Sequence, residues 1–144
     1  MHTRAAVLFL GLATSALSLQ AQSRWERQVQ EQLQVIAADL EPAGWRYAGD
    51  PYTGQLRQGQ DETLRVPLRG GVEYALVALC DEDCRDIEVR VLAEDDAVVA
   101  RSEGWNDTPL LEVRPAASGK YRIVVTMSHC GTSPCAYGVG IFQK

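Results

Sequence analysis

Residues 63–92 decide the fold, and they read TLRVPLRGGVEYALVALCDEDCRDIEVRVL. In residues 64–68, Leu and Val alternate with Arg and Pro, which predicts an edge strand because Pro cannot donate to a sheet ladder. After a glycine pair, residues 72–80 are apolar at nearly every position, which is typical of a central strand. Residues 87–91 return to alternation and predict a half-exposed strand. The stretch therefore predicts consecutive β-strands with different degrees of burial.

The same period of two continues to the end of the chain. Further strands are predicted at residues 97–100, 110–113, 120–127 and 137–142, with turn-forming residues between them. Short strands that recur at intervals of about 8 to 12 residues are typical of a β-sandwich. We therefore predict an all-β domain over residues 45–144, built as a jelly-roll-like antiparallel β-sandwich.

One amphipathic helix is predicted ahead of the sandwich, in residues 22–44. Ser23 and Glu26 have the spacing of a capping box, and Pro42 and Gly44 mark the end of the helix. Apolar residues recur between them at helical spacing: Trp25, Val29, Leu33, Ile36 and Leu40. We expect this stripe to cover one face or one end of the sandwich.

Residues 1–21 have the pattern of a cleaved, Sec-type signal peptide. A short basic start ends at Arg4, an uncharged apolar run follows, and residues 19–21 offer a small-residue cleavage site. The apolar run is shorter than the roughly 20 residues that span a bilayer. No later run reaches that length, and no cysteine for a lipid anchor lies near the cleavage site. The sequence therefore predicts a secreted or periplasmic protein without a membrane span after cleavage.

Export makes the four cysteines candidates for disulfide bonds. They form two close pairs, Cys80 with Cys84 and Cys130 with Cys135. We favour these local pairings because each pair lies between two predicted strands, while pairings between the two loops stay open until the geometry is known. A four-cysteine zinc site is the alternative, although thiolate clusters rarely persist in an oxidising compartment.

Several motifs resemble the bacterial pre-peptidase C-terminal domain. In chain order they are Gly71-Val72-Glu73-Tyr74, Asp86-Ile87-Glu88, Gly119-Lys120-Tyr121 and Tyr137-Gly138-Val139. The similarity covers roughly residues 55–142. It implies a jelly-roll-like sandwich that is exported and acts as an accessory or binding module of secreted hydrolases. This sequence departs from the family pattern at Glu88, where the family motif has its second Asp, and it carries no attached enzyme domain.

A dense run of carboxylates lies between Asp81 and Asp107, where ten acidic residues accompany only three arginines. Carboxylate oxygens are the ligands that Ca²⁺ prefers, so Asp83, Asp86 and Asp107 are candidate calcium ligands if their loops converge. The run does not follow the EF-hand pattern. A solvated acidic surface that keeps an exported protein soluble is the simpler alternative.

Three aromatic residues gather in a predicted loop rich in Gly and Pro, namely Trp45, Tyr47 and Tyr52. Exposed aromatic side chains on loops are common in surfaces that bind sugars or proteins. The alternative is that they pack where the helix joins the sandwich. Catalysis finds little support, because His129 is the only histidine after the signal peptide and no nucleophile motif accompanies it.

The charge balance narrows the function further. A formal net charge of −5 and a pI near 5.0 argue against a nucleic-acid partner. We therefore predict a secreted, non-catalytic binding or accessory module that recognises a protein or glycan, with calcium as a candidate structural ion. The alternative is a structural or stress-related envelope protein that self-associates through Trp25, Val29 and Leu33. The oligomeric state stays open, with a monomer as one option.

Overall fold

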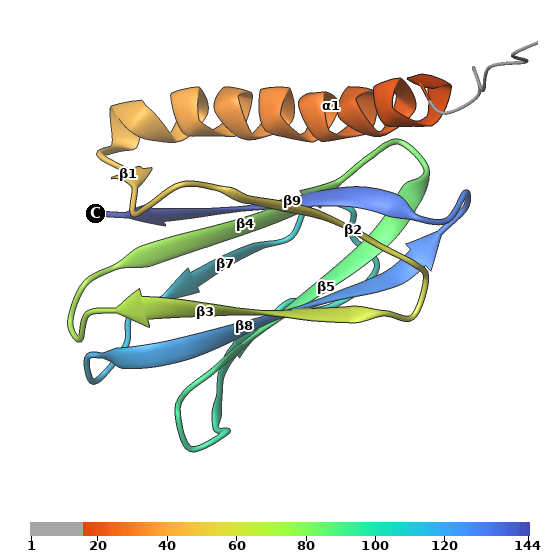
Figure 1. Cartoon of the computed structure of the whole chain (residues 1–144). Helices are drawn as coiled ribbons and strands as arrows, with labels where there is room; N and C mark the ends of the chain where they lie inside the picture. The colour runs from red at the N-terminus through yellow and green to blue at the C-terminus, as the bar shows by residue number, and fades with distance from the viewer. Residues whose placement is uncertain (1–15) are drawn as a thin grey trace, which may run out of the picture.

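The computed structural model describes residues 16–144, with side chains from Arg24 onward. The described chain is arranged in three layers (Figure 1). A helix lies across the outer face of one β-sheet, and a second sheet packs against the inner face of the first. We call the sheet under the helix sheet A and the other sheet B.

The elements follow one another in chain order as α1 (Ala16–Leu40), the 3-10 turn η1 (Glu41–Ala43), β1 (Arg46–Tyr47), β2 (Tyr52–Leu56), β3 (Asp61–Leu68), β4 (Tyr74–Cys80), β5 (Cys84–Leu92), β6 (Val98–Arg101), β7 (Leu110–Val113), β8 (Gly119–Cys130) and β9 (Cys135–Gln143). Sheet A has the order β1-β9-β4-β7, with β2 also paired to β9, and sheet B has the order β3-β8-β5-β6. The strand pairs described are antiparallel. The predicted antiparallel β-sandwich with one N-terminal helix is confirmed.

Strand β4 shows why the apolar run in the sequence is continuous. Every residue of β4 is buried. One face of the strand, including Leu76, belongs to the core between the sheets, while Leu79 and Val77 on the other face lie under the helix. The prediction of a central strand is therefore confirmed, and so is the edge position of β3, which carries Pro67 at the side of sheet B.

The apolar stripe of α1 faces sheet A, as predicted. Val29 and Leu33 are fully buried and pack on Leu79 and Ala136. The start of the helix was predicted wrongly, because α1 begins at Ala16 and Ser23 lies inside it. Residues 16–22 are mostly Ala, Leu and Gln, which continue a helix readily, so Ser23 caps no helix end.

The signal peptide is predicted in residues 1–21. Residues 1–15 of it lie outside the described residues. Helix α1 then runs through residue 21 without a break. Within residues 16–144, no helix is long and apolar enough to cross a membrane.

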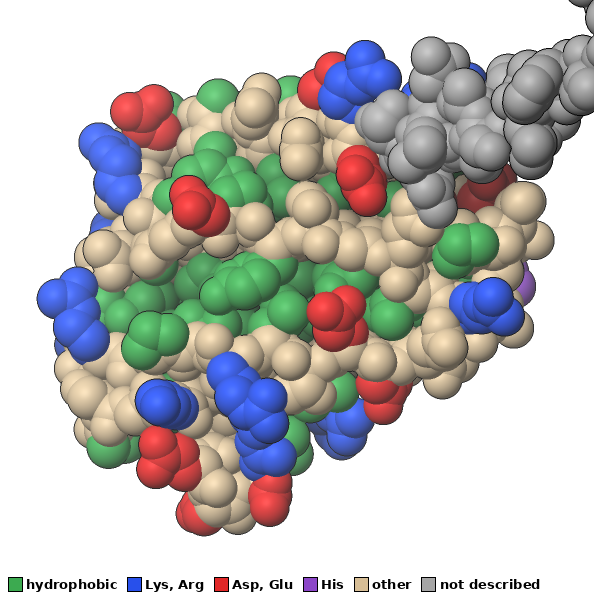
Figure 2. Space-filling model, in the orientation of Figure 1, with side chains coloured by type: hydrophobic (Ala, Val, Ile, Leu, Met, Phe, Trp, Pro, Cys, Tyr) green, Lys and Arg blue, Asp and Glu red, His purple; other side chains and the backbone are tan. Residues whose placement is uncertain are grey.

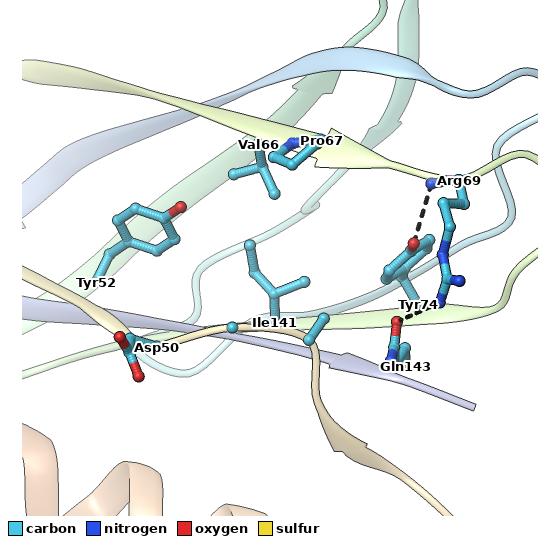
Figure 3. A pocket seen from close by; sticks show the side chains of 10 residues that line it. Asp50, Tyr52, Val66, Pro67, Arg69, Tyr74, Ile141 and Gln143 are labelled. Carbon is cyan, nitrogen blue, oxygen red and sulfur yellow. Dashed lines mark hydrogen bonds between the residues drawn. The ribbon is translucent and has the colours of Figure 1, made fainter.

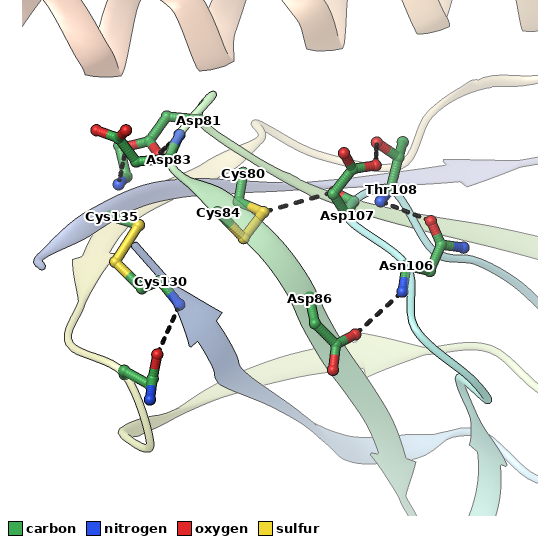
Figure 4. The surroundings of a disulfide bond; sticks show 12 residues. Cys80, Asp81, Asp83, Cys84, Asp86, Asn106, Asp107, Thr108, Cys130 and Cys135 are labelled. Atoms are coloured by element: carbon green, nitrogen blue, oxygen red, sulfur yellow. Dashed lines mark hydrogen bonds between the residues drawn. A yellow bond between two sulfur atoms is a disulfide. The ribbon is translucent and has the colours of Figure 1, made fainter. Parts of the chain in front are cut away.

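The two predicted disulfide bonds are present as local pairs, Cys80 with Cys84 and Cys130 with Cys135. Their Cα atoms lie 5.8 and 5.9 Å apart, which is the ordinary separation for a disulfide. Cys84 of β5 is opposite Cys130 of β8, so the two bridges lie at the same end of the sandwich (Figure 4). Each bridge closes a short loop between two strands.

Candidate functional site

An open groove lies between the edges of the two sheets, on the side where β2 and β3 face the viewer in Figure 2. Its volume is about 540 Å³. Apolar side chains line most of it, and polar groups stand at its rim (Figure 3). The apolar lining comes from Tyr52, Val66, Pro67, Tyr74 and Ile141, and the rim from Asp50, Arg69 and Gln143.

The groove is open because the edge of sheet A is interrupted there. Strands β1 and β2 both pair with β9, but residues 48–51, which read Ala-Gly-Asp-Pro, leave the sheet between them. A single hydrogen bond remains in the interval, from Ala48 N to Ile141 O at 2.8 Å. The side chain of Ile141 points from β9 toward Val66 of sheet B and forms part of the apolar lining of the groove (Figure 3).

Two tyrosines of sheet A reach across to sheet B. The Tyr74 hydroxyl accepts a hydrogen bond from Arg69 N at 3.0 Å, at the end of β3. The Tyr137 hydroxyl donates to the Glu62 carboxylate at the start of β3. Burial, together with the nearby Glu62 carboxylate, raises the pKa of Tyr137, so its phenol stays a proton donor. These two tyrosine hydrogen bonds hold the edge of sheet A at a fixed distance from the edge of sheet B.

The rim of the groove carries charges of both signs. Arg69 stands at one end, where its guanidinium donates to Gln143 Oε1 at 3.3 Å, and Asp50 stands on the wall formed by residues 48–51. Both side chains are exposed. An elongated apolar groove with separated charges of opposite sign suits a chain molecule better than a small single-charged ligand.

The three predicted aromatic binding residues do not form one surface. Tyr47 stacks on Phe142 with 4.4 Å between ring centroids, and its hydroxyl donates to Leu33 O at 3.1 Å. Trp45 packs in the same cluster under α1. Tyr47 and Trp45 therefore pack where the helix joins the sandwich, which was the alternative to a binding surface. Tyr52 instead lines the groove.

The three predicted calcium ligands lie apart (Figure 4). Asp86 accepts a hydrogen bond from Asn106 N at 3.1 Å, and Asp107 accepts one from the Thr108 hydroxyl at 3.1 Å. Asp83 lies in the first disulfide loop. Among the residues that the structure describes, no group of three or more His, Cys, Asp or Glu side chains is placed to hold a metal ion. The loops do not converge as a calcium site requires.

Calcium is accordingly expected to leave the stability unchanged. Millimolar Ca²⁺ added to the EDTA-treated, oxidised protein should move Tm by less than about 1 °C. A ligand at about 100 times its Kd would instead add roughly 2.7 kcal/mol, which corresponds to a shift of several degrees. Such a shift, abolished by Asp83→Asn, would contradict the separation seen between the three carboxylates.

Sequence reasoning missed one prominent exposed aromatic side chain. Trp105 is 69% exposed and lies 5.1 Å from the ring of His129, centroid to centroid. Its position among Gly, Asn and Asp residues in a predicted loop was the available signal. The groove residues Val66, Ile141 and Arg69 were also missed, because they belong to strands or strand ends far apart in the sequence.

Two solved structures of known proteins are similar in fold to this chain. No protein-family model and no curated protein sequence matches the chain. Among solved structures, it is similar to a periplasmic inhibitor of g-type lysozyme from Aeromonas hydrophila, with 16% identity, 66% of this chain and 85% of that chain covered, and a TM-score of 0.49. It is also similar to a pre-peptidase C-terminal domain of a Bacillus anthracis collagenase, with 13% identity, coverage of 64% and 87%, and a TM-score of 0.48. The second structure is a domain of the family that the sequence motifs resemble.

Proposed function

We propose that this protein is a secreted, non-catalytic binding module that holds an extended segment of a protein partner in the groove between β2 and β3. One observation carries the proposal. The apolar groove opens beside the C-terminal end of β3, at Val66 and Pro67, and in the described structure β3 pairs with β8 on one side only. The groove and the free strand edge together offer side-chain pockets and backbone partners to the same ligand.

A free strand edge presents N–H and C=O groups that an added strand can pair with. On β3 this pairing is restricted to residues 61–66, because Pro67 has no N–H to donate. Successive side chains of an extended segment point to opposite sides, so every second side chain would enter the groove. There it would contact Val66, Ile141 and Tyr52.

The size and lining of the groove agree with this occupant. Ligand pockets typically measure about 300–1,000 Å³ and are mostly apolar with a few polar groups. The groove falls in that range, at about 540 Å³. We therefore expect the bound segment to alternate apolar and polar residues, with an acidic residue near Arg69 and a basic residue near Asp50.

The two disulfide bonds support an exported location. Disulfides form and persist in oxidising compartments such as the periplasm and the cell exterior. They support, together with the signal peptide predicted from residues 1–21, a partner that lies outside the cytoplasm.

The structure argues against the alternative of self-association through the helix. Val29 is 0% and Leu33 is 1% exposed, since both pack on sheet A. Trp25 is partly buried against the same cluster. These residues are therefore not available to a second copy while α1 stays docked.

The proposal can be tested by selecting peptides of about ten residues from a displayed library against the mature, oxidised protein. We expect the selected peptides to share alternating apolar residues and to slow hydrogen exchange at residues 61–66. Tyr52→Ser and Arg69→Glu should each weaken a selected peptide by about tenfold.

The matched control is Trp105→Ser, which removes an exposed aromatic ring at another place and should leave the affinity unchanged. Thermal unfolding of each variant checks that the fold persists. The proposal is wrong if no peptide is selected above background, or if the groove variants bind a selected peptide as well as the control does.

A further inference from the structure

The outer face of sheet B, which points away from the core, carries one arginine on each strand. These are Arg65 on β3, Arg122 on β8, Arg90 on β5 and Arg101 on β6. Their neighbours in sequence, including Leu64, Ile123 and Val89, belong to the core between the sheets. Because successive residues of a strand point to opposite faces, the four arginines share the outer face. In Figure 2, Lys and Arg side chains lie on the sheet B side of the groove, with Asp and Glu side chains between them.

The strand register places the arginines in a continuous track. Arg65 is directly opposite Arg122, and Arg90 is directly opposite Arg101. Val124 joins the two pairs, since it is two residues from Arg122 along β8 and directly opposite Arg90. Although Val124 does not belong to the core between the sheets, it is only 8% exposed. Neighbouring side chains therefore lie over it, and the track crosses all four strands.

The acidic residues of the protein neutralise only part of this track. Arg122 pairs with Asp96, and Arg101 pairs with Glu103 at 3.5 Å. In the described structure, Arg65 and Arg90 have no acidic partner. Like charges directly opposite each other on neighbouring strands are destabilising, and this sheet has two such pairs. An anion bound along the track would relieve that repulsion.

We propose that the outer face of sheet B binds an acidic polysaccharide, a linear polymer with one carboxylate on each sugar. Neighbouring strands lie about 4.8 Å apart, so the two arginines of each opposite pair, Arg65 with Arg122 and Arg90 with Arg101, are set at about that interval, while the two pairs are offset by two residues along the strands. A sugar unit in a linear chain advances by a similar distance, so successive carboxylates match the two arginines within one pair. The planar guanidinium also matches a carboxylate in a two-point hydrogen bond.

The same observations disfavour other anionic partners. Duplex DNA carries a charge about every 1.7 Å, which is much denser than the track, and the protein as a whole is acidic. A membrane surface would contact the whole face, including Asp61 and Glu88 in the neighbouring row, which repel anionic headgroups. A single polymer chain contacts the track alone.

The proposal is tested with polygalacturonate as the probe and the mature, oxidised protein. We expect binding at low ionic strength that weakens as salt is added, and no binding to neutral dextran. The double variant Arg65→Gln with Arg90→Gln should weaken binding by about tenfold or more. The matched control, Arg24→Gln with Arg57→Gln, removes the same net charge from the helix and from the turn after β2.

Each outcome decides the matter. Loss of binding in the track variant and not in the control supports the proposal. Equal loss in both variants shows an effect of net charge alone and overturns it. Binding to phosphatidylglycerol vesicles or to duplex DNA without binding to polygalacturonate also overturns it, as does no binding to any of them. Tyr52→Ser should leave polygalacturonate binding unchanged, so the groove and the track are tested separately.

Discussion

Replacing Gly138 by Val is expected to lower the free energy of unfolding by about 3 kcal/mol, because the new side chain has no room under α1. A Cβ atom on Gly138 would lie 2.5 Å from Val29 Cγ1 and 2.9 Å from Leu33 Cδ1. Val29 and Leu33 are themselves buried against sheet A, so they cannot move aside without leaving the core. Denaturant unfolding of the variant measures the loss.

A second glycine provides the control. A Cβ atom on Gly49 would have no other atom within 4 Å, so Gly49→Val should change the stability by less than about 0.5 kcal/mol. Removing the methyl groups of Val29 should make room for a Cβ atom on Gly138. The double variant Val29→Ala with Gly138→Ala should therefore lose less unfolding free energy than the sum of the losses in the two single variants. Strict additivity of the two, or equal losses in both glycine-to-valine variants, would contradict close docking at Gly138.

The docking of the helix also supports the groove. The Tyr47 hydroxyl donates to Leu33 O, which ties β1 to α1. Residues 48–51 leave the sheet directly after Tyr47 and form one wall of the groove. A helix lifted by Gly138→Val would release this wall, so we expect the variant to weaken peptide binding in the groove as well.

Much of the fold follows from local patterns in the sequence. Strand β4 is buried on both faces, so its sequence is a continuous apolar run. Strand β5 is buried mainly on one face, so its sequence alternates between apolar and polar residues. The disulfide pairs follow from short separations along the chain. The apolar stripe of α1 follows from its helical spacing. In all these cases, the residues that carry the signal lie within one element or one short loop.

Strands β1 and β2 could not be predicted in the same way. They are short and lie in a stretch rich in Gly, Pro and Asp, which is typical of loops. Their strand conformation depends on pairing with β9, at the far end of the chain. Gly138 presents the same difficulty. A glycine is required there because α1 packs directly over it, and this contact cannot be seen in the sequence around Gly138.

The candidate sites depend even more on long-range register. Arg65 and Arg122 are neighbours only because β3 pairs with β8, and Arg90 joins them through β5. The same dependence explains the calcium prediction. Asp83, Asp86 and Asp107 belong to one acidic stretch of sequence, but Asp86 lies in β5 and accepts a hydrogen bond from Asn106 N, Asp107 accepts one from the Thr108 hydroxyl, and Asp83 lies in the first disulfide loop. Local density of carboxylates did not predict their convergence.

Replacing Asp81 by Asn is expected to lower the free energy of unfolding by about 2 kcal/mol, because an amide has one acceptor oxygen where the carboxylate has two. Asp81 is buried, and its two oxygens accept hydrogen bonds from Ala136 N at 2.6 Å and Asp83 N at 3.1 Å. Asp81 N donates in return to Ala136 O at 3.0 Å. The side chain therefore ties the first disulfide loop to the start of β9, beside the second. Asp83→Asn makes the same change of charge two residues away and should cost much less.

The pH dependence distinguishes the two effects that act on this carboxyl. Burial, with a smaller contribution from the Asp83 charge, raises the pKa of Asp81 above its ordinary value, against the backbone N–H groups of Ala136, Asp83 and Cys84 that lower it. Between the ordinary and the raised pKa, the folded protein binds more protons than the unfolded chain, so this group adds stability as the pH falls and loses it as the pH rises through the folded pKa. Asn cannot titrate, so the difference in unfolding free energy between the wild type and Asp81→Asn should widen as the pH is lowered from 7 towards about 4. Urea unfolding across that range measures it, and a difference that narrows instead would show that the N–H donors outweigh burial and hold the pKa of Asp81 below its ordinary value.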